Sequence, residues 1–330
     1  MKETLIYLSK KNILTKKDAR NIMMNIGQGK YTDPEIASFL TVYLMREITS
    51  PELSGFREAL LELAVPVDLS GFNTIDVCGT GGDEKNTFNI STLTALVLAG
   101  AGEKVVKHGN YAVSSACGSS NVMEHFGYKF SNSQEKLSKE IEHAGICYMH
   151  APLFHPALKY VGPVRKSLRL KTFFNLLGPM VNPSRPKNQI VGVYSEESVE
   201  LYHQVFVDGG IHHFIIHSLD GYDEISLTGN FRVVSDSEDK ILSPAALGLP
   251  AAKPEDIHGG NTTHEALSIF SAILEGKGTD AQNNVVCANA AFALKCLHPE
   301  HSLEDCLAIA RISIDNGSAR RVFKKLIDLQ

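Results

Sequence analysis

From residue 71 to the C-terminus, short runs rich in β-branched residues alternate with longer segments of helical spacing. The runs predicted as strands are NTIDVC, EKVVK, QIVGVY, HHFIIHS and FRVVS. The segments TLTALVLAGAG, SQEKLSKEIEHAG and SVELYHQVFVDGG lie between strands, and each is typical of a helix that ends at glycine. Because parallel strands need a crossover connection, usually a helix, this alternation predicts an α/β fold with a mostly parallel central sheet covered by helices.

Residues 1 to 70 carry helical signals almost exclusively. Thr15, Asp33-Pro34 and Ser50-Pro51 are start signals, and each precedes a segment with apolar residues at helix-face spacing. These helices are too few to enclose a core, so we expect them to pack on another element or on a second subunit. The sequence therefore predicts a helical domain at 1–70 and an α/β domain at 71–330.

A proline-rich stretch at about residues 155–185 interrupts the alternation, and we interpret it as an excursion that packs against the helical domain. The C-terminal part is helical again, with the segments HEALSIFSAILEG, NNVVCANAAFALKCL and SLEDCLAIARISIDNG.

Composition and charge exclude several classes of protein. The hydrophobic fraction of 43% and the charged fraction of 21% are ordinary for a folded globular chain, and the net charge of -5 argues against a nucleic-acid-binding protein. The N-terminus lacks the apolar core of a signal peptide, and the most apolar stretch, Leu93 to Gly102, is about half the ~20 residues that a membrane span requires. The six cysteines are dispersed without a C-x-x-C pair, which favours free thiols in a reducing compartment. We expect a cytoplasmic protein with no membrane partner.

The segment IDVCGTGGDEKNTFNIST predicts a strand, a glycine loop and a helix start. Gly79, Gly81 and Gly82 allow backbone N–H groups to face an anion, next to the positive end of the helix. The segment matches neither a Walker loop nor the dinucleotide fingerprint. A tight turn is the alternative interpretation, but the polar residues behind the glycines favour a phosphate site, with Asn89 or Ser91 as the helix cap; these residues are Asp83, Asn89, Ser91 and Thr92.

The segment KHGNYAVSSACGSSN, residues 107–121, predicts a second such loop after a second strand. Lys107 can neutralise a phosphate oxygen, Ser115 and Ser119 can donate to others, and Gly109 and Gly118 permit close approach. Two loops at neighbouring strand ends predict a polyphosphate ligand. A lone histidine is more often a core residue, but the position of His108 on a polar loop favours a ligand contact.

The acids Asp223 and Glu224 are adjacent in HSLDGYDEIS, after an apolar strand. Adjacent acids usually mark a solvated turn. In a chain with two anion loops they can instead hold Mg²⁺, which prefers one or two carboxylates together with phosphate oxygens.

The motifs GTGGD, NIST, KHGN, GSS, HPALKYVGPVR, FNLLGP and DGYDEIS occur in this order over nearly the whole chain, which resembles the anthranilate phosphoribosyltransferases from about residue 4 to the end. The resemblance implies a small helical N-terminal domain hinged to a larger α/β domain of the nucleoside phosphorylase/phosphoribosyltransferase type, and a homodimer formed through the helical domains. It also implies transfer of the phosphoribosyl group from 5-phosphoribosyl 1-pyrophosphate to the amine of anthranilate in tryptophan biosynthesis.

The resemblance also implies roles for individual residues, with Lys107, His108 and Arg165 most directly involved in catalysis. Mg²⁺ would be held by Asp223, Glu224 and Ser91. The anthranilate site would contain Asn110, His108, His155, Arg165 and Pro179, with Arg165 and Asn110 facing the carboxylate; for Arg165, the residue pattern alone favours a surface ion pair. The phosphoribosyl donor would be held by Gly79, Thr80, Gly81, Gly82, Asp83, Asn89, Ser91, Thr92, Lys107 and Ser119, and Thr87 is a further substrate-binding residue.

The chain departs from the family pattern at a few positions. Tyr111 stands where the family often has arginine, Ser120-Asn121 replaces the common Ala-Asp, and Arg169 replaces a common glycine. A pyrimidine nucleoside phosphorylase is the nearest alternative enzyme, but it should lack the acid pair and the His-Gly-Asn arrangement. A non-catalytic nucleic-acid-binding relative is the other alternative, and the acidic net charge argues against it.

Overall fold

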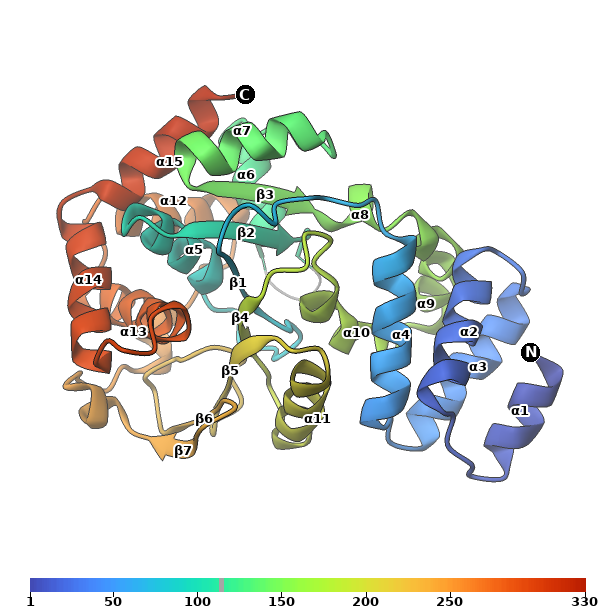
Figure 1. Ribbon diagram of the computed structural model, residues 1–330. Helices are drawn as coiled ribbons and strands as arrows, with labels where there is room; N and C mark the ends of the chain where they lie inside the picture. The colour runs from blue at the N-terminus through green and yellow to red at the C-terminus, as the bar shows by residue number, and fades with distance from the viewer. Residues whose placement is uncertain (113–115) are drawn as a thin grey trace. The chain divides into compact units, whose positions relative to one another are not determined.

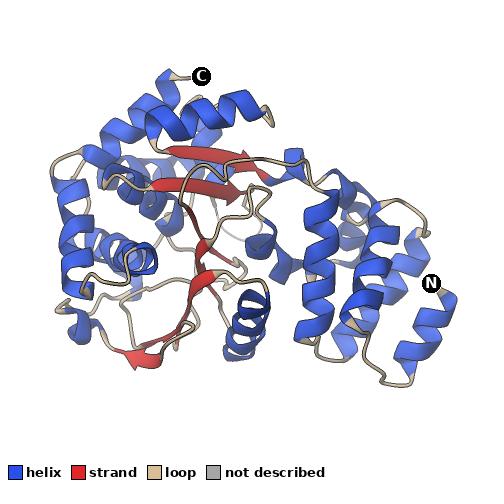
Figure 2. Cartoon of the chain, viewed as in Figure 1, coloured by secondary structure: helices blue, strands red, loops and turns tan. Residues whose placement is uncertain are grey.

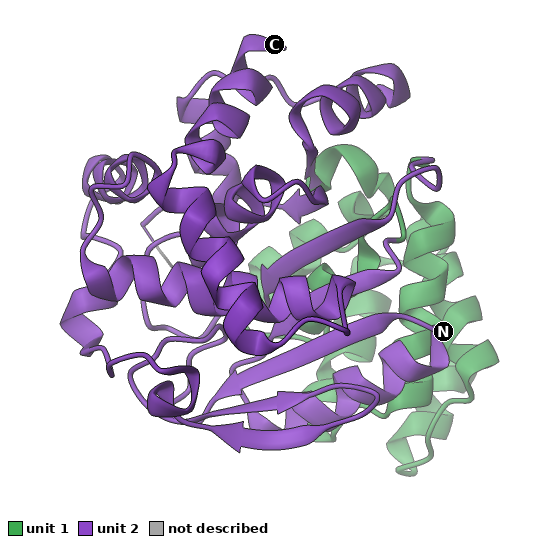
Figure 3. Ribbon diagram, turned by 60° about the vertical axis from the view of Figure 1, so that its left-hand side comes forward, with its two compact units in different colours: residues 1–67, 151–185 green, residues 68–150, 186–330 purple. Residues whose placement is uncertain are grey.

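The computed structural model describes residues 1–112 and 116–330. The chain forms two compact units, which Figure 3 colours separately. Unit 1 comprises residues 1–67 and 151–185, and unit 2 comprises residues 68–150 and 186–330.

Unit 2 is built on a seven-stranded sheet with the strand order β3-β2-β1-β4-β5-β6-β7 (Figures 1 and 2). The strands are β1 Thr74–Gly79, β2 Lys104–Gly109, β3 Ile146–His150, β4 Asn188–Gly192, β5 His212–Ser218, β6 Phe231–Val234 and β7 Asp239–Leu242. The pairs from β3 to β5 are parallel, and β6 and β7 join the β5 edge in antiparallel fashion. The predicted α/β fold with a mostly parallel sheet is therefore confirmed.

Two buried helices hold the centre of this sheet. Helix α5 (Ile90–Gly100) packs against β1 and β2, and α13 (Asp280–Leu297) packs against β4 and β5. Each is buried along its middle, α5 over residues 92–99 and α13 over residues 284–294, as expected of a helix that other elements enclose. Helix α11 (Glu196–Asp208) covers β5 from the opposite face (Figure 1). The other helices of unit 2 are α6 Ser119–His125, α7 Gln134–Ala144, α12 Thr263–Leu274, α14 Leu303–Asp315, α15 Ser318–Asp328, η3 Pro244–Leu247 and η4 Pro254–Ile257.

All the regular secondary structure described in unit 1 is helical. Helices α2 and α4 approach closely because Gly55 has no side chain, since a Cβ there would lie 2.3 Å from the carbonyl oxygen of Lys16. The ring of Phe173, from the proline-rich stretch, stacks on Phe56 of α4 at 4.7 Å. The helices are α1 Lys2–Ser9, α2 Lys16–Gly27, α3 Asp33–Met45, α4 Ser50–Leu63, α8 Ala151–Phe154, η1 Pro156–Tyr160, α9 Gly162–Leu168, α10 Phe174–Leu177 and η2 Gly178–Val181.

The whole described chain has two further general properties. None of its helices combines the length and the apolar character needed to cross a membrane. All six cysteines are free thiols, and four of them are buried.

A buried carboxylate, Glu52, ties three segments of unit 1 together. Its side chain accepts hydrogen bonds from the backbone N–H of Leu14 and the hydroxyl of Tyr43, both at 3.0 Å, and it pairs with Arg46. It also forms the capping box of α4 with Thr49. Burial opposes ionisation of Glu52, but the hydrogen bonds from Arg46 and the backbone outweigh it, so the pKa of Glu52 lies below its ordinary value.

Replacing Glu52 with Gln should destabilise unit 1 by about 3 kcal/mol at pH 7, because Arg46 then remains partly buried without its counter-charge. Urea unfolding followed by circular dichroism measures the loss. The pKa of Glu52 is lowered in the folded state, so its contribution is present above the ordinary value of 4.5 and disappears as the pH falls through the folded value. The difference between the variant and the parent protein should therefore shrink in acid.

Glu62→Gln is the matched control, because Glu62 forms an exposed ion pair with Arg20. It should cost less than ~1 kcal/mol. Equal losses in the two variants would contradict the role given to Glu52.

Candidate active site

The predicted phosphate loops and the acid pair all lie in unit 2, beyond the carboxyl ends of parallel strands, where α/β sheets usually bind ligands. The glycine loop, residues 79–83, follows β1. The acid turn, residues 219–224, follows β5. Thr80 donates its backbone N–H to the carbonyl of Gly192 at 2.9 Å, and Gly81 donates its N–H to Asp223 Oδ2 at 2.6 Å. The glycine loop is therefore bonded both to the neighbouring strand and to the acid turn.

Two strand-end glycines make room for the acid turn. A Cβ on Gly79 would lie 2.3 Å from Asp223 Oδ2, and a Cβ on Gly192 would lie 1.5 Å from the carbonyl oxygen of Asp223. Both distances are shorter than any allowed contact with backbone or carboxylate. Only glycine at these two positions lets Asp223 sit against the ends of β1 and β4.

Lys107 and His108 both lie within β2 and are buried, so the expected position of His108 on a polar loop is wrong, whereas Lys107 belongs to the predicted strand EKVVK. Lys107 Nζ donates to the carbonyl of Val77 at 2.7 Å and to Ser91 Oγ at 3.2 Å. The ammonium group thus lies between β1 and the start of α5. The backbone N–H of His108 donates to Asp76 Oδ1 at 3.4 Å.

The acids repel one another in a buried setting. Burial and the charge of Asp83 raise the pKa of Asp223 to about 7. Burial and the charge of Asp223 raise the pKa of Glu224 well above its ordinary value, while Lys107 and a hydrogen bond with Ser91 act in the opposite direction. A cation bound beside these carboxylates would be strongly stabilised, because it would relieve the repulsion that raises their pKa values.

These residues fit Mg²⁺, because Asp223, Glu224 and Ser91 offer hard oxygen donors next to excess negative charge. Among the described residues, however, no group of three or more His, Cys, Asp or Glu side chains is arranged to enclose a metal ion. The remaining ligands of such an ion would have to be water or substrate oxygens, as is usual for Mg²⁺.

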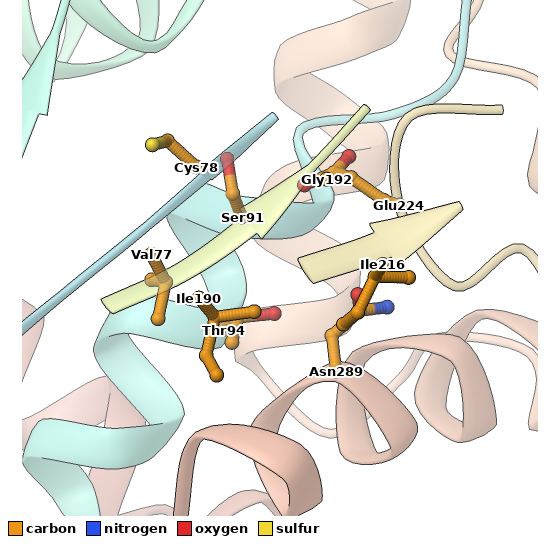
Figure 4. Close-up of a pocket in the computed structure, with 9 residues that line it drawn as sticks. All are labelled: Val77, Cys78, Ser91, Thr94, Ile190, Gly192, Ile216, Glu224 and Asn289. Atoms are coloured by element: carbon orange, nitrogen blue, oxygen red, sulfur yellow. The ribbon is translucent and has the colours of Figure 1, made fainter. Parts of the chain in front are cut away.

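A small cavity lies beside Glu224, with Ser91 and Thr94 of α5 and Asn289 of α13 in its wall (Figure 4). Its volume is about 10 Å³, which is room for one water molecule. Thr94 Oγ1 is buried without a hydrogen-bond partner among the described residues, so a water in this cavity would satisfy it. The start of α5 and the acid turn thus border the same small cavity, whose remaining lining includes the apolar side chains of Val77, Ile190 and Ile216.

Asn289 holds the residue that follows the acid pair. Its Oδ1 accepts the N–H of Ile225 at 3.1 Å, and its Nδ2 donates to the carbonyl of Ile225 at 2.9 Å. The amide therefore replaces the partners that a neighbouring strand would offer to Ile225, and it fixes the backbone immediately after Glu224.

Sequence reasoning missed both Asn289 and Gly192, although each had a signal. Asn289 is a buried polar residue within the apolar run VVCANAAFAL. Gly192 interrupts the apolar strand pattern of QIVGVY, which often marks the close approach of another backbone.

Side-chain amides hold several of the described residues around the loop after β2. Asn89 occupies the N-cap position of α5, but its side chain does not cap the helix and instead donates to the carbonyl of Cys117 at 2.9 Å. Asn121 Oδ1 accepts the N–H groups of Gly118 and Ala112 at 3.0 and 3.1 Å. Asn110 is exposed, and its carbonyl accepts the N–H of Ser120 at 3.1 Å. Ser115, predicted as a phosphate donor, lies outside the described residues.

The other predicted donor-binding residues differ in exposure. Thr92 lies on α5 and is 3% exposed, so its hydroxyl is turned into the protein. Asp83 accepts the N–H of Lys85 at 3.2 Å, and Thr87 forms a backbone bridge with His258.

His155, Arg165 and Pro179 belong to unit 1. Burial lowers the pKa of His155 to about 4, so its ring is neutral at pH 7. The Arg165 guanidinium lies 5.4 Å from the centre of the Phe174 ring and 3.4 Å from Asn175 Oδ1. It has no carboxylate partner among the described residues, so the ion pair favoured by the residue pattern alone is wrong. Pro179 is buried in η2.

The chain is similar to known proteins over its whole length. Residues 71–320 match the glycosyl transferase family a/b domain, and residues 2–64 match the helical bundle domain of that family. An anthranilate phosphoribosyltransferase of Flavobacterium psychrophilum is 54% identical over 329 residues, covering 100% of this chain and 99% of the relative. The crystal structure of anthranilate phosphoribosyltransferase from Thermus thermophilus gives a TM-score of 0.93 at 30% identity and covers 98% of each chain. The anthranilate phosphoribosyltransferase of Saccharomyces cerevisiae, in complex with PRPP and Mg, gives a TM-score of 0.88 at 26% identity, covering 100% of this chain and 98% of that chain.

Gly192→Ala tests the close approach of the acid turn to β4. The added Cβ would meet the backbone of Asp223, which cannot move aside as a flexible side chain can, so we expect a loss of about 1–3 kcal/mol in unfolding free energy. Gly71→Ala is the control, because no heavy atom lies within 4 Å of a Cβ at that position. Urea unfolding of both variants gives the comparison, and a Gly192→Ala protein as stable as its control would show that the turn is not packed as described.

Proposed function

The chain belongs to the anthranilate phosphoribosyltransferase family, and we propose that it works in cytoplasmic tryptophan biosynthesis as a Mg²⁺-dependent homodimer. It transfers the phosphoribosyl group from 5-phosphoribosyl 1-pyrophosphate to the amine of anthranilate, giving N-(5-phosphoribosyl)anthranilate and pyrophosphate. The sequence match to relatives of this activity over the full chain does not favour the nucleoside phosphorylase or nucleic-acid-binding alternatives.

Our proposal for the donor site rests on one observation above all: the buried carboxylate of Asp223 in the acid turn accepts the backbone N–H of Gly81 in the glycine loop at 2.6 Å. In this proposal the glycine loop, with Thr80, Asp83 and Asn89, binds the pyrophosphate of the donor, and Ser119 binds its 5-phosphate. Thr87 and Thr92 complete the donor site.

Asp223, Glu224 and Ser91 would hold Mg²⁺, which when bound would offset the negative charge of the departing pyrophosphate. The charge of Lys107 acts on the same region through Ser91, to which its ammonium donates at 3.2 Å. Its charge favours the ionised form of Glu224, because it partly opposes the rise that burial and Asp223 cause in the pKa of that carboxyl. Lys107 thereby supports the acids, in addition to the phosphate contact that the family resemblance implies.

The acceptor needs positioning more than it needs a base. The amine of anthranilate is neutral at pH 7, so it can attack the ribose carbon without first losing a proton. His108 and Asn110 are proposed to orient the aromatic acceptor, with His108 available for the proton released after attack. His155, Arg165 and Pro179 are proposed to contribute to acceptor binding, and Arg165 is the one group among them with a full positive charge at pH 7.

The double variant Asp223→Asn/Glu224→Gln tests the metal assignment. It removes two ligand charges while preserving shape, so turnover should fall below detection and the affinity for Mn²⁺, measured by electron paramagnetic resonance in the presence of the phosphoribosyl donor, should be lost. Thermal unfolding should show that the protein remains folded.

The control variant Glu304→Gln/Asp305→Asn makes the same change of charge in an exposed pair at the start of α14. It should keep activity and metal affinity. Near-normal turnover of the Asp223→Asn/Glu224→Gln protein at limiting Mg²⁺ would show that the metal lies elsewhere.

Arg165→Lys tests recognition of the anthranilate carboxylate. A guanidinium can donate two parallel N–H groups to a carboxylate, which an ammonium cannot reproduce. The variant should lose ~1.5 to 3 kcal/mol of acceptor recognition, or about one to two decades in kcat/KM for anthranilate, with little change for the phosphoribosyl donor.

Arg169→Lys is the control, because Arg169 is exposed and directly follows α9, the helix that contains Arg165. It should leave kcat/KM unchanged for both anthranilate and the phosphoribosyl donor. Equal damage to both substrates by Arg165→Lys would assign Arg165 a structural role instead.

A further inference from the structure

Four polar side chains of unit 2 form a continuous line from β3 to the start of α6. His150 Nδ1 lies 2.8 Å from Ser120 Oγ, which lies 2.9 Å from Tyr148 Oη. Tyr148 Oη in turn lies 2.8 Å from Ser119 Oγ. His150, Ser120 and Tyr148 are buried, whereas Ser119 is partly exposed. The line therefore runs from the interior to the residue proposed to bind the 5-phosphate.

The hydrogen bonds of this line all have the same direction, with each group donating to the next from His150 toward Ser119. The geometry makes Tyr148 the donor to Ser119, and a hydroxyl has only one proton to donate. Ser120 must then donate to Tyr148, and His150 must donate to Ser120 through Nδ1–H. Burial lowers the pKa of His150 and raises the pKa of Tyr148, so the ring is neutral and the phenol keeps its proton at pH 7. The proton of Ser119 is left with a long contact of 3.3 Å to the carbonyl of Asn110.

The surroundings fix these four residues in place. A Cβ on Gly109 would lie 2.2 Å from Tyr148 Oη and 2.4 Å from Ser119 Oγ, so the end of β2 must be glycine for the line to form. The His150 ring is stacked on Phe130 at 4.4 Å and meets the edge of Tyr111 at 4.8 Å. Tyr111, which stands where the family often has arginine, thus helps to hold the inner end, and its hydroxyl donates to Glu124 at 3.1 Å.

We propose that His150, Ser120 and Tyr148 are positioning residues that hold the Ser119 hydroxyl as a polarised donor to the 5-phosphate of the phosphoribosyl donor. We call this line of hydrogen bonds, from His150 through Ser120 and Tyr148 to Ser119, the relay. Hydrogen bonds in a chain strengthen one another, so a hydroxyl that accepts from Tyr148 is a better donor to an anion. The proposal rests on the proposed role of Ser119 in binding this substrate.

Tyr148→Phe tests the relay, because it removes one hydroxyl and keeps the ring. We expect KM for the phosphoribosyl donor to rise about three- to tenfold, the usual effect of one hydrogen bond, while KM for anthranilate stays within about twofold. Tyr128→Phe is the matched control: this tyrosine is also buried beside Tyr148, and its hydroxyl bonds to Glu140 and to the backbone carbonyl of Tyr148 but to none of the four side chains of the relay. The control should lose a similar amount of stability and leave both KM values unchanged.

A double-mutant cycle separates positioning from general damage. Ser119→Ala alone should raise KM for the phosphoribosyl donor, and adding Tyr148→Phe to it should have no further effect, because the two residues act through one hydroxyl. His150→Asn keeps an N–H donor near the position of Nδ1 and should retain most of the affinity, whereas His150→Leu should behave like Tyr148→Phe.

The outcomes that would overturn the proposal are distinct. If Ser119→Ala leaves KM for the phosphoribosyl donor unchanged, both the role of Ser119 and the relay are wrong. If Ser119→Ala raises that constant but Tyr148→Phe matches its control, or if the two changes add independently, Ser119 binds the substrate without the relay. Equal effects of His150→Asn and His150→Leu would overturn the assigned direction of the hydrogen bonds.

Discussion

The approach of Asp223 to the ends of β1 and β4 is the contact on which the rest of the site depends. A side chain at Gly79 or Gly192 would overlap this residue, so the two strands must end in glycine for the acid turn to reach the glycine loop. Asn289 then fixes the backbone after the turn, and Ser91 of α5 and the charge of Lys107 in β2 act on Glu224. Elements that are distant in the sequence thus meet at one end of a parallel sheet, as expected for this class of fold.

This arrangement places like charges together in a buried environment, which costs folding free energy in the absence of a cation. The raised pKa values of Asp223 and Glu224 express that cost. Such a cost is common where a site is preorganised for a charged ligand, because the groups need not rearrange when it binds. The buried carboxylate Glu52 of unit 1 shows the opposite effect. Hydrogen bonds from Arg46 and from backbone N–H groups lower its pKa.

The sequence predicted the parts of the fold that have strong local signals. Helices α2, α3 and α4 begin at the predicted start residues, and β1, β2, β4, β5 and β6 coincide with the apolar runs. It did not predict β3, whose five residues are all buried and so show no alternation, nor β7, a charged strand at the sheet edge.

At the candidate site, the glycine loop and the acid pair could be proposed from the sequence, since glycines and adjacent acids stand out in the chain. It could not show that Lys107 is buried against Val77 and Ser91, or that Tyr148 and His150 connect to Ser119, because these contacts join residues from different strands and depend on the register of β2 with β3.

The central property of this chain is that it couples the loss of pyrophosphate from the phosphoribosyl donor to the consumption of anthranilate. The most direct measurement follows anthranilate fluorescence and released pyrophosphate in the same reaction. We expect fluorescence to fall only when the donor and Mg²⁺ are both present, and we expect anthranilate consumed and pyrophosphate released to be equal in amount. A folded protein that leaves anthranilate unchanged, or that releases pyrophosphate without consuming it, would contradict this coupling.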